Sequence, residues 1–296
     1  MANLKEIRTR IASVSSTRQI TSAMKMVSAA KLRKAQDAIL QLRPYSEKFS
    51  EILSAMSDAL REDKENPYIN GREVEKVLLV VISSNRGLCG AFNSSVIKRT
   101  TYLANKVYEK QKANDSLDLL IIGKKAEDYF KKRNYNILES HNDIFDELSY
   151  ENVTRLAEDI MKRYVDGQYD FIELVYNQFK NAAVQILSEE QYLPIKLEKE
   201  EKEEKKFQTF DDYIFEPSKE YIVRNLIPHS LKLQLFKAIL DSHASEHGAR
   251  MTAMHKATDN ATELIKDLKL DYNKARQASI TNEILEIVSG ANALEG

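Results

Sequence analysis

The segment from His243 to His247 carries the residue types of a zinc site. The two histidines are four residues apart with Glu246 between them, in the H-x-x-E-H order of one class of zinc protease. On a helix this spacing places both imidazoles on one face, beside a carboxylate. A catalytic zinc also needs a third ligand and an open position in a cleft. Because the same histidines fit polar seam positions of a long helix, a zinc hydrolase is kept as an alternative to a structural role.

A second candidate for chemistry is the segment Ser83–Gly90, with the sequence SSNRGLCG. It lies between an apolar run and a helical pattern, where α/β proteins often bind phosphate. It matches neither G-x-G-x-x-G nor G-x-x-x-x-G-K-[ST]. Cys89 would need a positioned base to act as a nucleophile, and no histidine is suggested nearby. We interpret the segment as a structural turn, with nucleotide or thiol chemistry as the alternative.

The elements around this turn alternate between strands and helices. Short apolar runs such as VLLVVI predict buried strands, and the longer amphipathic stretches predict helices. The expected strands are 77–82, 117–122, 135–138, 169–176 and 182–187, which 193–197 can extend; the expected helices are 91–112, 124–133 and 149–165. This alternation is typical of a small α/β sheet covered on both faces.

The N-terminal 45 residues predict a long helix that begins at an Asn3–Glu6 capping pair. Its 3,4 spacing defines a coiled-coil seam whose middle members are polar. The seam positions are Leu4, Ile7, Ile11, Val14, Arg18, Thr21, Lys25, Ser28, Leu32, Ala35, Ile39 and Leu42. In the polar stretch the apolar residues Ile20, Met24 and Val27 fall one position earlier, which turns the apolar stripe by about 100°. The middle of this helix is therefore expected to offer its apolar side to another partner.

A second long helix is expected at the other end of the chain. A helix starts at Ser218, and Pro228 fits the first turn of another that continues to Gly290, on the order of 90 Å at 1.5 Å per residue. Two such helices flanking a globular insert are best paired antiparallel. The predicted fold is an antiparallel coiled coil of N- and C-terminal helices with a central Rossmann-like α/β domain. The predicted segments are 1–66, 67–217 with a foot, and 218–296.

The charge distribution indicates the kind of partner. The chain has 296 residues, with 44 Lys and Arg against 45 Asp and Glu, yet residues 1–45 contain nine basic and two acidic residues, a net +7. Such asymmetry favours an acidic protein surface or a nucleic acid. No aromatic residue precedes Tyr45, so the bases of a nucleic acid would have nothing to stack on. We favour the acidic protein surface and keep a nucleic-acid scaffold as an alternative.

Composition excludes other classes. One Cys excludes a disulfide framework, and no run approaches the roughly 18 apolar residues of a membrane span. The C-terminal tip is apolar on several sides, which predicts that it sits in a sleeve formed by other subunits, with homodimerisation as the alternative. The tip residues are Ile280, Ile284, Leu285, Ile287, Val288, Ala291 and Leu294.

Four stretches resemble the gamma subunit of rotary F-type ATP synthase, of the bacterial type. They are ITSAMKMVSAAKLR at 20–33, SNRGLCG at 84–90, ARMTAMHKATDNA at 249–261 and YNKARQASITNEI at 272–284. The resemblance extends over essentially the whole chain. It implies a non-catalytic rotor, without a cofactor, whose terminal helices turn inside a ring of three alpha and three beta subunits. Ion flow through the membrane c-ring would thus be coupled to ATP synthesis or hydrolysis at the beta subunits.

The resemblance also implies contact residues. The shaft contacts to the ring map onto Met24, Lys25, Arg276, Gln277 and Thr281, and the bearing tip onto Ile284, Leu285, Ile287 and Val288. Lys25 departs from the family, since many relatives carry an acidic residue there. Tyr213 and Glu216 look like the foot that meets the c-ring and the epsilon subunit. No transit segment precedes the family's start, so the expected location is the cytoplasmic face of a bacterial plasma membrane, as a peripheral subunit of a proton-transporting complex.

Overall fold

The structure is a computed structural model that describes residues 4–55, 66–69, 71–195 and 219–295. It contains two compact units, one formed by Met1–Ala29 and Arg250–Gly296 and the other by Ala30–Ala249. The two long helices, α1 (Leu4–Ala55) and α7 (Lys219–Glu295), each contribute residues to both units. The division of the chain at 66 and 217 stays a prediction.

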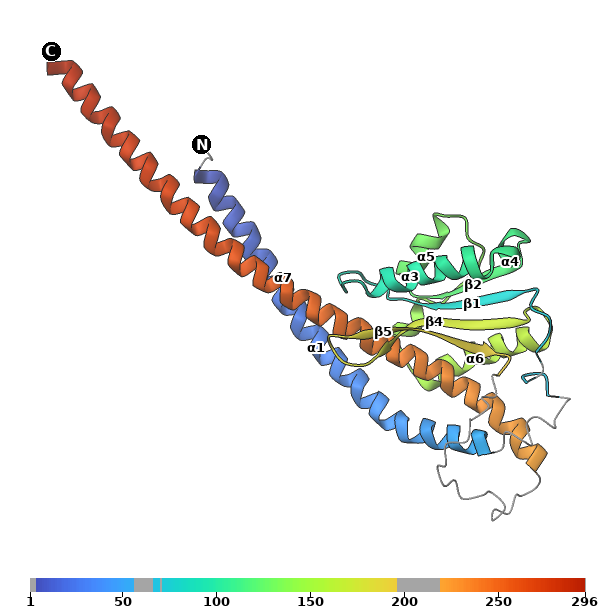
Figure 1. Cartoon of the computed structure of the whole chain (residues 1–296). Helices are drawn as coiled ribbons and strands as arrows, with labels where there is room; N and C mark the ends of the chain where they lie inside the picture. The colour runs from blue at the N-terminus through green and yellow to red at the C-terminus, as the bar shows by residue number, and fades with distance from the viewer. Residues whose placement is uncertain (1–3, 56–65, 70, 196–218, 296) are drawn as a thin grey trace, which may run out of the picture. The chain divides into compact units, whose positions relative to one another are not determined.

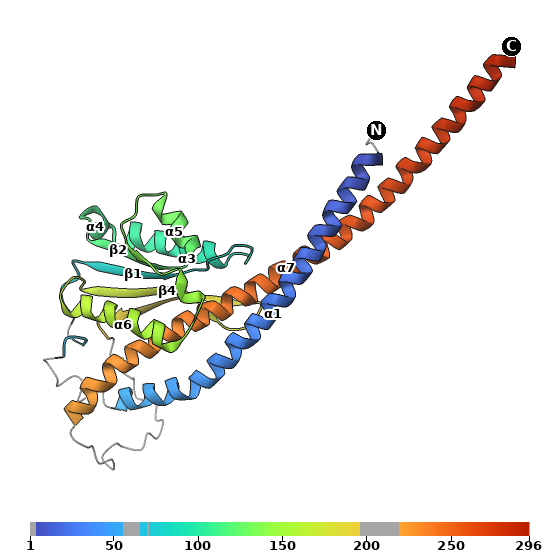
Figure 2. The same ribbon diagram turned by 180° about the vertical axis from the view of Figure 1, so that it is seen from behind.

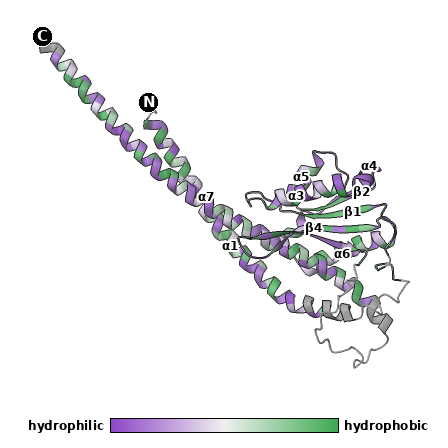
Figure 3. Ribbon diagram, in the orientation of Figure 1, coloured by the Kyte–Doolittle hydropathy of each residue, from purple (hydrophilic) through white to green (hydrophobic). Residues whose placement is uncertain are grey.

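The larger unit is built on a five-stranded sheet in the order β3-β2-β1-β4-β5 (Figure 1). The strands are β1 (Val77–Ile82), β2 (Leu117–Ile122), β3 (Ile137–Ser140), β4 (Phe171–Phe179) and β5 (Gln185–Leu193). The first four are parallel, and β5 pairs antiparallel with β4. The central strand β1 is buried at every residue and is hydrophobic along its length (Figure 3), as expected of a strand covered on both faces.

Helices cover both faces of this sheet (Figure 2). One face packs against α3 (Phe92–Tyr102), the π-helical turn η1 (Leu103–Val107) and α5 (Lys124–Lys131). The other packs against α6 (Tyr150–Val165) and the first part of α7. The alternation of β1 side chains between these two cores follows from the two-residue period of a strand. The short α4 (Glu109–Ala113) and η2 (Asp143–Phe145) complete the unit.

Most predicted elements are confirmed, but several boundaries were wrong. The strands at 77–82 and 117–122 form as expected, whereas the third strand lies at Ile137–Ser140 and the two closing strands are longer than predicted. The single helix expected over 91–112 is divided into α3, η1 and α4. The π-turn closes with the Tyr108 N–H donating to the Leu103 carbonyl at 2.8 Å.

The two prolines within the long helices do not end them. Pro44 lies inside α1 and Pro228 lies inside α7, so the second helix expected to begin at Pro228 is a continuation of the one before it. A proline removes one backbone hydrogen bond from the ladder. Tertiary packing offsets this loss in α7, because Ile227, Leu231 and Leu235 are all at most 2% exposed within the core.

Gly248 lies in the middle of α7 because the β4–β5 hairpin approaches the helix there. A Cβ at this position would lie 3.2 Å from both the Cα and the carbonyl oxygen of Ala182. Helix-interior glycine is unfavourable by up to about 1 kcal/mol relative to alanine. The close packing of the hairpin backbone on α7, which glycine permits, offsets this cost.

We therefore predict opposite effects for two glycines of α7. Gly248→Ala is expected to lower the free energy of unfolding by about 1 kcal/mol, since the added methyl must push the Ala182 backbone away. Gly290→Ala is the matched control, with no atom within 4 Å, and should leave the unfolding midpoint unchanged or raise it. Urea denaturation of both variants checks this. Equal stability of the two variants would show that the hairpin contact does not constrain position 248.

Candidate interaction surface of the paired helices

In the smaller unit, α1 and α7 pack antiparallel along the predicted seam. Every predicted seam position of this unit, from Leu4 to Ser28, is buried or half-buried, and so, within the larger unit, is every one from Leu32 to Leu42. The polar members follow the same rule, with Thr21 8% exposed and Ser28 3% exposed. The sequence therefore predicted the buried face of α1 correctly, including its polar stretch.

Polar contacts also cross this seam between described residues of the smaller unit. Arg8 donates from Nη2 to the Tyr272 hydroxyl at 2.8 Å, and Thr258 Oγ1 lies 2.8 Å from Thr21 Oγ1. Lys25 Nζ lies 3.4 Å from His255 Nδ1. As the residue number rises on α1 it falls on α7, which confirms the antiparallel pairing.

The apolar residues next to the polar stretch face away from the seam. Ile20 is 58% exposed and Val27 57% exposed, whereas Met24 is half-buried. Met26, which the 3,4 spacing did not indicate, is 65% exposed and belongs to the same group of exposed apolar side chains as Ile20 and Val27. The apolar residues that lie one position before the seam positions thus form an open apolar surface on the described part of α1, as the sequence predicted.

On α7 some apolar residues lie outside the buried stripe. Leu264 is 46% exposed, and Leu270 is 59% exposed. Their neighbours Ala261 and Leu268 are buried at 7% and 8%. One helix partner covers only a narrow stripe, so the apolar residues outside that stripe stay open.

The last turns of α7 run past the start of α1, within the same unit (Figures 1 and 2). Residues 280–292 are all exposed, and the predicted tip residues Ile284, Leu285, Ile287 and Val288 range from 50% to 71% exposed. Just before the tip, a groove of about 410 Å³ lies between the helices, lined by Ile7 and Arg10 on one side and Leu268 and Ala278 on the other.

The predicted contact residues fall in two separate places. Lys25, next to Met24 in the chain, contacts His255, whereas Arg276, Gln277 and Thr281 lie about 30 Å further along α7. The last three are exposed, and the Thr281 hydroxyl donates to the Gln277 carbonyl at 2.9 Å. Tyr213 and Glu216, assigned to the foot, lie outside the described residues.

The Ser83–Gly90 turn is a structural element. Its polar groups cap the start of α5: the Lys124 N–H donates to Asn85 Oδ1 at 3.0 Å and the Ala126 N–H to Ser83 Oγ at 3.1 Å. These are N–H groups that a phosphate would otherwise use. Gly123 is required at this junction, because its φ is 108° and a Cβ would lie 2.2 Å from the Ser83 carbonyl oxygen.

Cys89 is part of the same turn. It is 2% exposed, and Asn93 Nδ2 donates to its Sγ at 3.1 Å. A nucleophilic thiol needs access and an adjacent base. The burial of Cys89 and its amide partner therefore support the structural interpretation.

The H-x-x-E-H segment is packed inside the larger unit. His243 Nε2 and His247 Nε2 lie 3.1 Å apart, and the His243 ring stacks on Phe145 at a centroid distance of 5.8 Å. Glu246 and His247 are 7% and 4% exposed. Among the described residues, no group of three or more His, Cys, Asp or Glu side chains is placed to hold a metal ion. The zinc interpretation therefore lacks a third ligand there.

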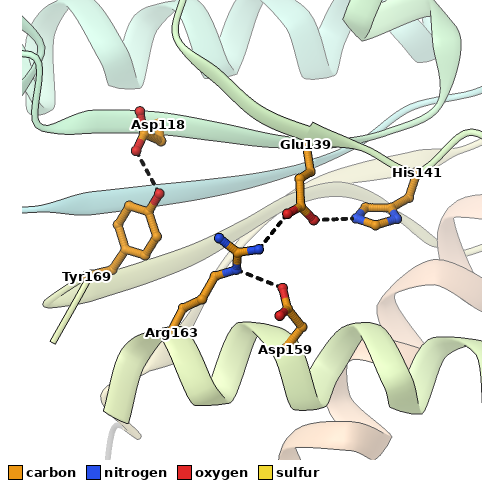
Figure 4. A network of polar contacts seen from close by, with 6 residues as sticks. All are labelled: Asp118, Glu139, His141, Asp159, Arg163 and Tyr169. Atoms are coloured by element: carbon orange, nitrogen blue, oxygen red, sulfur yellow. Dashed lines mark hydrogen bonds and ion pairs between the residues drawn. The ribbon is translucent and has the colours of Figure 1, made fainter. Parts of the chain in front are cut away.

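A charged network joins β3 to α6 in the same unit (Figure 4). Arg163 bridges Glu139 and Asp159, with a distance of 2.7 Å to Asp159, and Glu139 also contacts His141 at 3.1 Å. Tyr169 donates to Asp118 at 2.6 Å, and burial raises the pKa of this phenol. Each carboxylate here has a hydrogen-bond donor within the chain, so the network is suited to holding the elements together.

Asp241 is a buried carboxylate on the face of α7 turned into the larger unit. Burial raises its pKa to about 6, with Glu190 adding to the shift and Lys237 and Arg43 opposing it. A carboxyl group whose pKa is higher in the folded state binds its proton more tightly there. Stability is therefore lost as the pH rises through the interval from about 4, the unfolded value, to about 6.

Asp241→Asn is predicted to stabilise the chain by about 1–3 kcal/mol at pH 8, because it removes a buried charge. The gain should shrink as the pH falls toward 4, where the native carboxyl group is protonated. Asp128→Asn, an exposed site on α5, is the matched control and should change stability by less than about 0.5 kcal/mol at either pH. Urea titrations at the two pH values measure both. A stabilisation that does not depend on pH would contradict the assignment.

The chain has two long helices that pair antiparallel, a Rossmann-like α/β domain and an exposed apolar tip. These three features define the class of protein with which it can be compared. A family model described as ATP synthase matches residues 3–294. The ATP synthase gamma chain of Christiangramia forsetii is 60% identical over 296 residues, with all of both chains covered. That of Flavobacterium johnsoniae is 60% identical over 300 residues, again with all of both chains covered.

Solved structures show the same fold at low sequence identity. The rotor of the Euglena gracilis mitochondrial ATP synthase matches with a TM-score of 0.66 and 21% identity, covering 94% of this chain and 98% of that one. Because the family model and these two relatives match the chain over essentially its full length, the chain belongs to the family of ATP synthase gamma chains. The resemblance found in the sequence is therefore confirmed. Across the described residues, no helix has the length and apolarity needed to span a bilayer.

Proposed function

We propose that the chain is the non-catalytic central shaft of a rotary ATP synthase. It couples ion flow through the membrane c-ring to ATP synthesis or hydrolysis at the beta subunits. Its partners are the alpha, beta, epsilon and c-ring subunits, and it acts at the cytoplasmic face of the bacterial plasma membrane as a peripheral subunit. Family membership supports this proposal, together with the surfaces that the helical pair leaves open.

The observation that carries the proposal is the uncovered apolar tip of α7. Apolar side chains that are half or more exposed on one helix have a strong tendency to be buried by a partner. The tip presents Ile284, Leu285, Ile287 and Val288 around its circumference, so a single flat surface cannot cover them all. A sleeve formed by the ring of alpha and beta subunits covers every side and still permits rotation.

The exposed stripe of α1 supplies the asymmetry that a rotor requires. Ile20, Met26 and Val27 are open, whereas the seam residues Thr21 and Ser28 are buried against α7. As such a shaft turns, each beta subunit meets first an apolar and then a polar surface. A ligand or partner shifts a conformational equilibrium only through different contact free energies in the two states. Rotation delivers that difference to each site in turn.

The ring contacts are proposed at Met24, Arg276, Gln277 and Thr281. The basic N-terminal helix faces acidic loops of the beta subunits in this arrangement, which accounts for its net +7 over residues 1–45. Tyr213 and Glu216 are proposed as the foot to the c-ring and epsilon, from sequence alone. Co-expression with alpha, beta and epsilon subunits tests the assembly.

The first test concerns the contacts near the tip. Arg276→Ala and Gln277→Ala are exposed substitutions and should leave the melting temperature of the chain unchanged. In the complex assembled with alpha and beta subunits they should lower ATP-driven rotation about fivefold, equivalent to about 1 kcal/mol of lost contact. Lys269→Ala, an exposed cation on the same helix, is the control. Hydrolysis of ATP by the isolated chain at the rate of the complex would refute the non-catalytic role.

Removal of residues 280–296 tests the bearing. Residues 280–292 are all exposed, so the truncated chain should retain its helical circular dichroism, less the missing turns, and its melting temperature. Its affinity for the ring of alpha and beta subunits should fall at least tenfold, because the buried apolar side chains are lost. Sedimentation of the assembled complex measures this affinity. Unchanged affinity would exclude a sleeve around the tip.

The two alternatives from the sequence have separate tests. A zinc hydrolase requires stoichiometric zinc in the purified chain. A nucleic-acid scaffold requires salt-sensitive binding to duplex DNA.

A further inference from the structure

Lys25 lies in the seam between the two helices. It is half-buried and shares a helix face with Thr21 and Ser28, which are four residues before it and three after it. These two neighbours are 8% and 3% exposed. The open side of the same turns carries Met26 and Val27, at 65% and 57% exposure. The lysine side chain therefore starts on the side of α1 that faces α7.

The ammonium group meets a histidine of α7. Lys25 Nζ lies 3.4 Å from His255 Nδ1, and an ammonium group can only donate. His255 Nδ1 therefore accepts in this contact. Asp259 Oδ2 lies 3.4 Å from the same Nδ1, from the next turn of α7. Because this oxygen and the accepting Nδ1 are both acceptors, Asp259 does not bond to the imidazole here and acts through the attraction of its charge to the ammonium group.

We propose that Lys25 is a positioning residue that fastens α1 to α7 through His255 and Asp259. This role takes the place of the ring contact that the family resemblance implies for this position. The positive charge at position 25 matches the carboxylate of Asp259 across the seam, with His255 between them as the hydrogen-bond acceptor of the lysine. The proposal deepens the proposed rotor function, because a shaft transmits torque only if its two helices move together.

The charge logic predicts a rescue. Lys25→Glu places a carboxylate opposite Asp259, and like charges repel. His255→Lys then restores an ammonium group between the two carboxylates. A ring contact has no such dependence on residue 255, so the double variant distinguishes the two roles.

Hydrogen exchange of the full chain measures the seam directly. Lys25→Glu should accelerate exchange about two- to fivefold in peptides covering residues 18–29 and 251–262, and the Lys25→Glu/His255→Lys double variant should restore it. Lys266→Glu, an exposed reversal on α7, is the control and should leave these peptides unchanged. Unchanged exchange in the α7 peptide with Lys25→Glu, or no rescue by His255→Lys, would overturn the proposal. If Lys25→Glu fails to fold, Lys25→Met replaces it, because methionine keeps the apolar stem and removes the charge. Lys25→Met should also accelerate exchange in these peptides, and no increase would count against the proposal.

ATP-driven rotation of the complex with alpha and beta subunits provides the second readout. A loss with Lys25→Glu that His255→Lys reverses supports the seam role. A loss that persists in the double variant identifies Lys25 as a ring contact and overturns it. If the native chain does not join the ring at all, the proposed function fails, and the hydrogen-exchange result on the chain alone still decides the role of Lys25.

Discussion

Burial of one face of α7 is the interaction on which the rest of the structure depends. Between Ile227 and Ile239 this face lies in the same core as α6 and the strands. A few turns later it meets the β4–β5 hairpin at Gly248 and the Ser83–Gly90 turn through Ala249, which packs with Cys89 and Phe92. From Met254 to Leu268 it packs against α1 within the smaller unit. The helix must therefore change partners along its length.

This change of partners explains the composition of α7. Where it contacts the sheet it buries leucine and isoleucine, and where the hairpin and the turn approach closely it presents small or polar residues. Ala244, Ser245 and Ala249 are nearly fully buried there. Asp241 is retained in the same region although its charge is unfavourable at neutral pH, with Lys237 and Arg43 offsetting part of its burial.

The sequence predicts elements whose periodicity is controlled by one dominant partner. Strands β1 and β2 are recovered to the residue, and the seam of α1 is recovered through its polar stretch because a 3,4 pattern reports one partner helix. Gly248 had no explanation at that level, because its reason is the Ala182 backbone, distant in sequence. The helix start expected at Pro228 was wrong for a related reason, because the continuation of α7 through that residue depends on which tertiary partner covers each turn. The contact surface was found from apolar residues that one partner could not bury, but Met26 was missed because it lies outside the strict spacing.

The polar stretch of the seam has a physical purpose that an apolar seam could not fulfil. Leucine layers pack almost equally well after a shift of one heptad, so they stabilise a helical pair without fixing its register. The hydroxyl groups of Thr21 and Thr258 meet at 2.8 Å, and Arg8 meets Tyr272 at the same distance; a shift of one turn would break both contacts. Thr21 is 8% exposed, and a buried hydroxyl group that loses its partner carries a desolvation penalty of about 1–3 kcal/mol. The seam thus gives up some apolar burial and gains a single register, and a fixed register keeps the exposed stripe on α1 and the tip of α7 at a constant angle to one another within the unit they share.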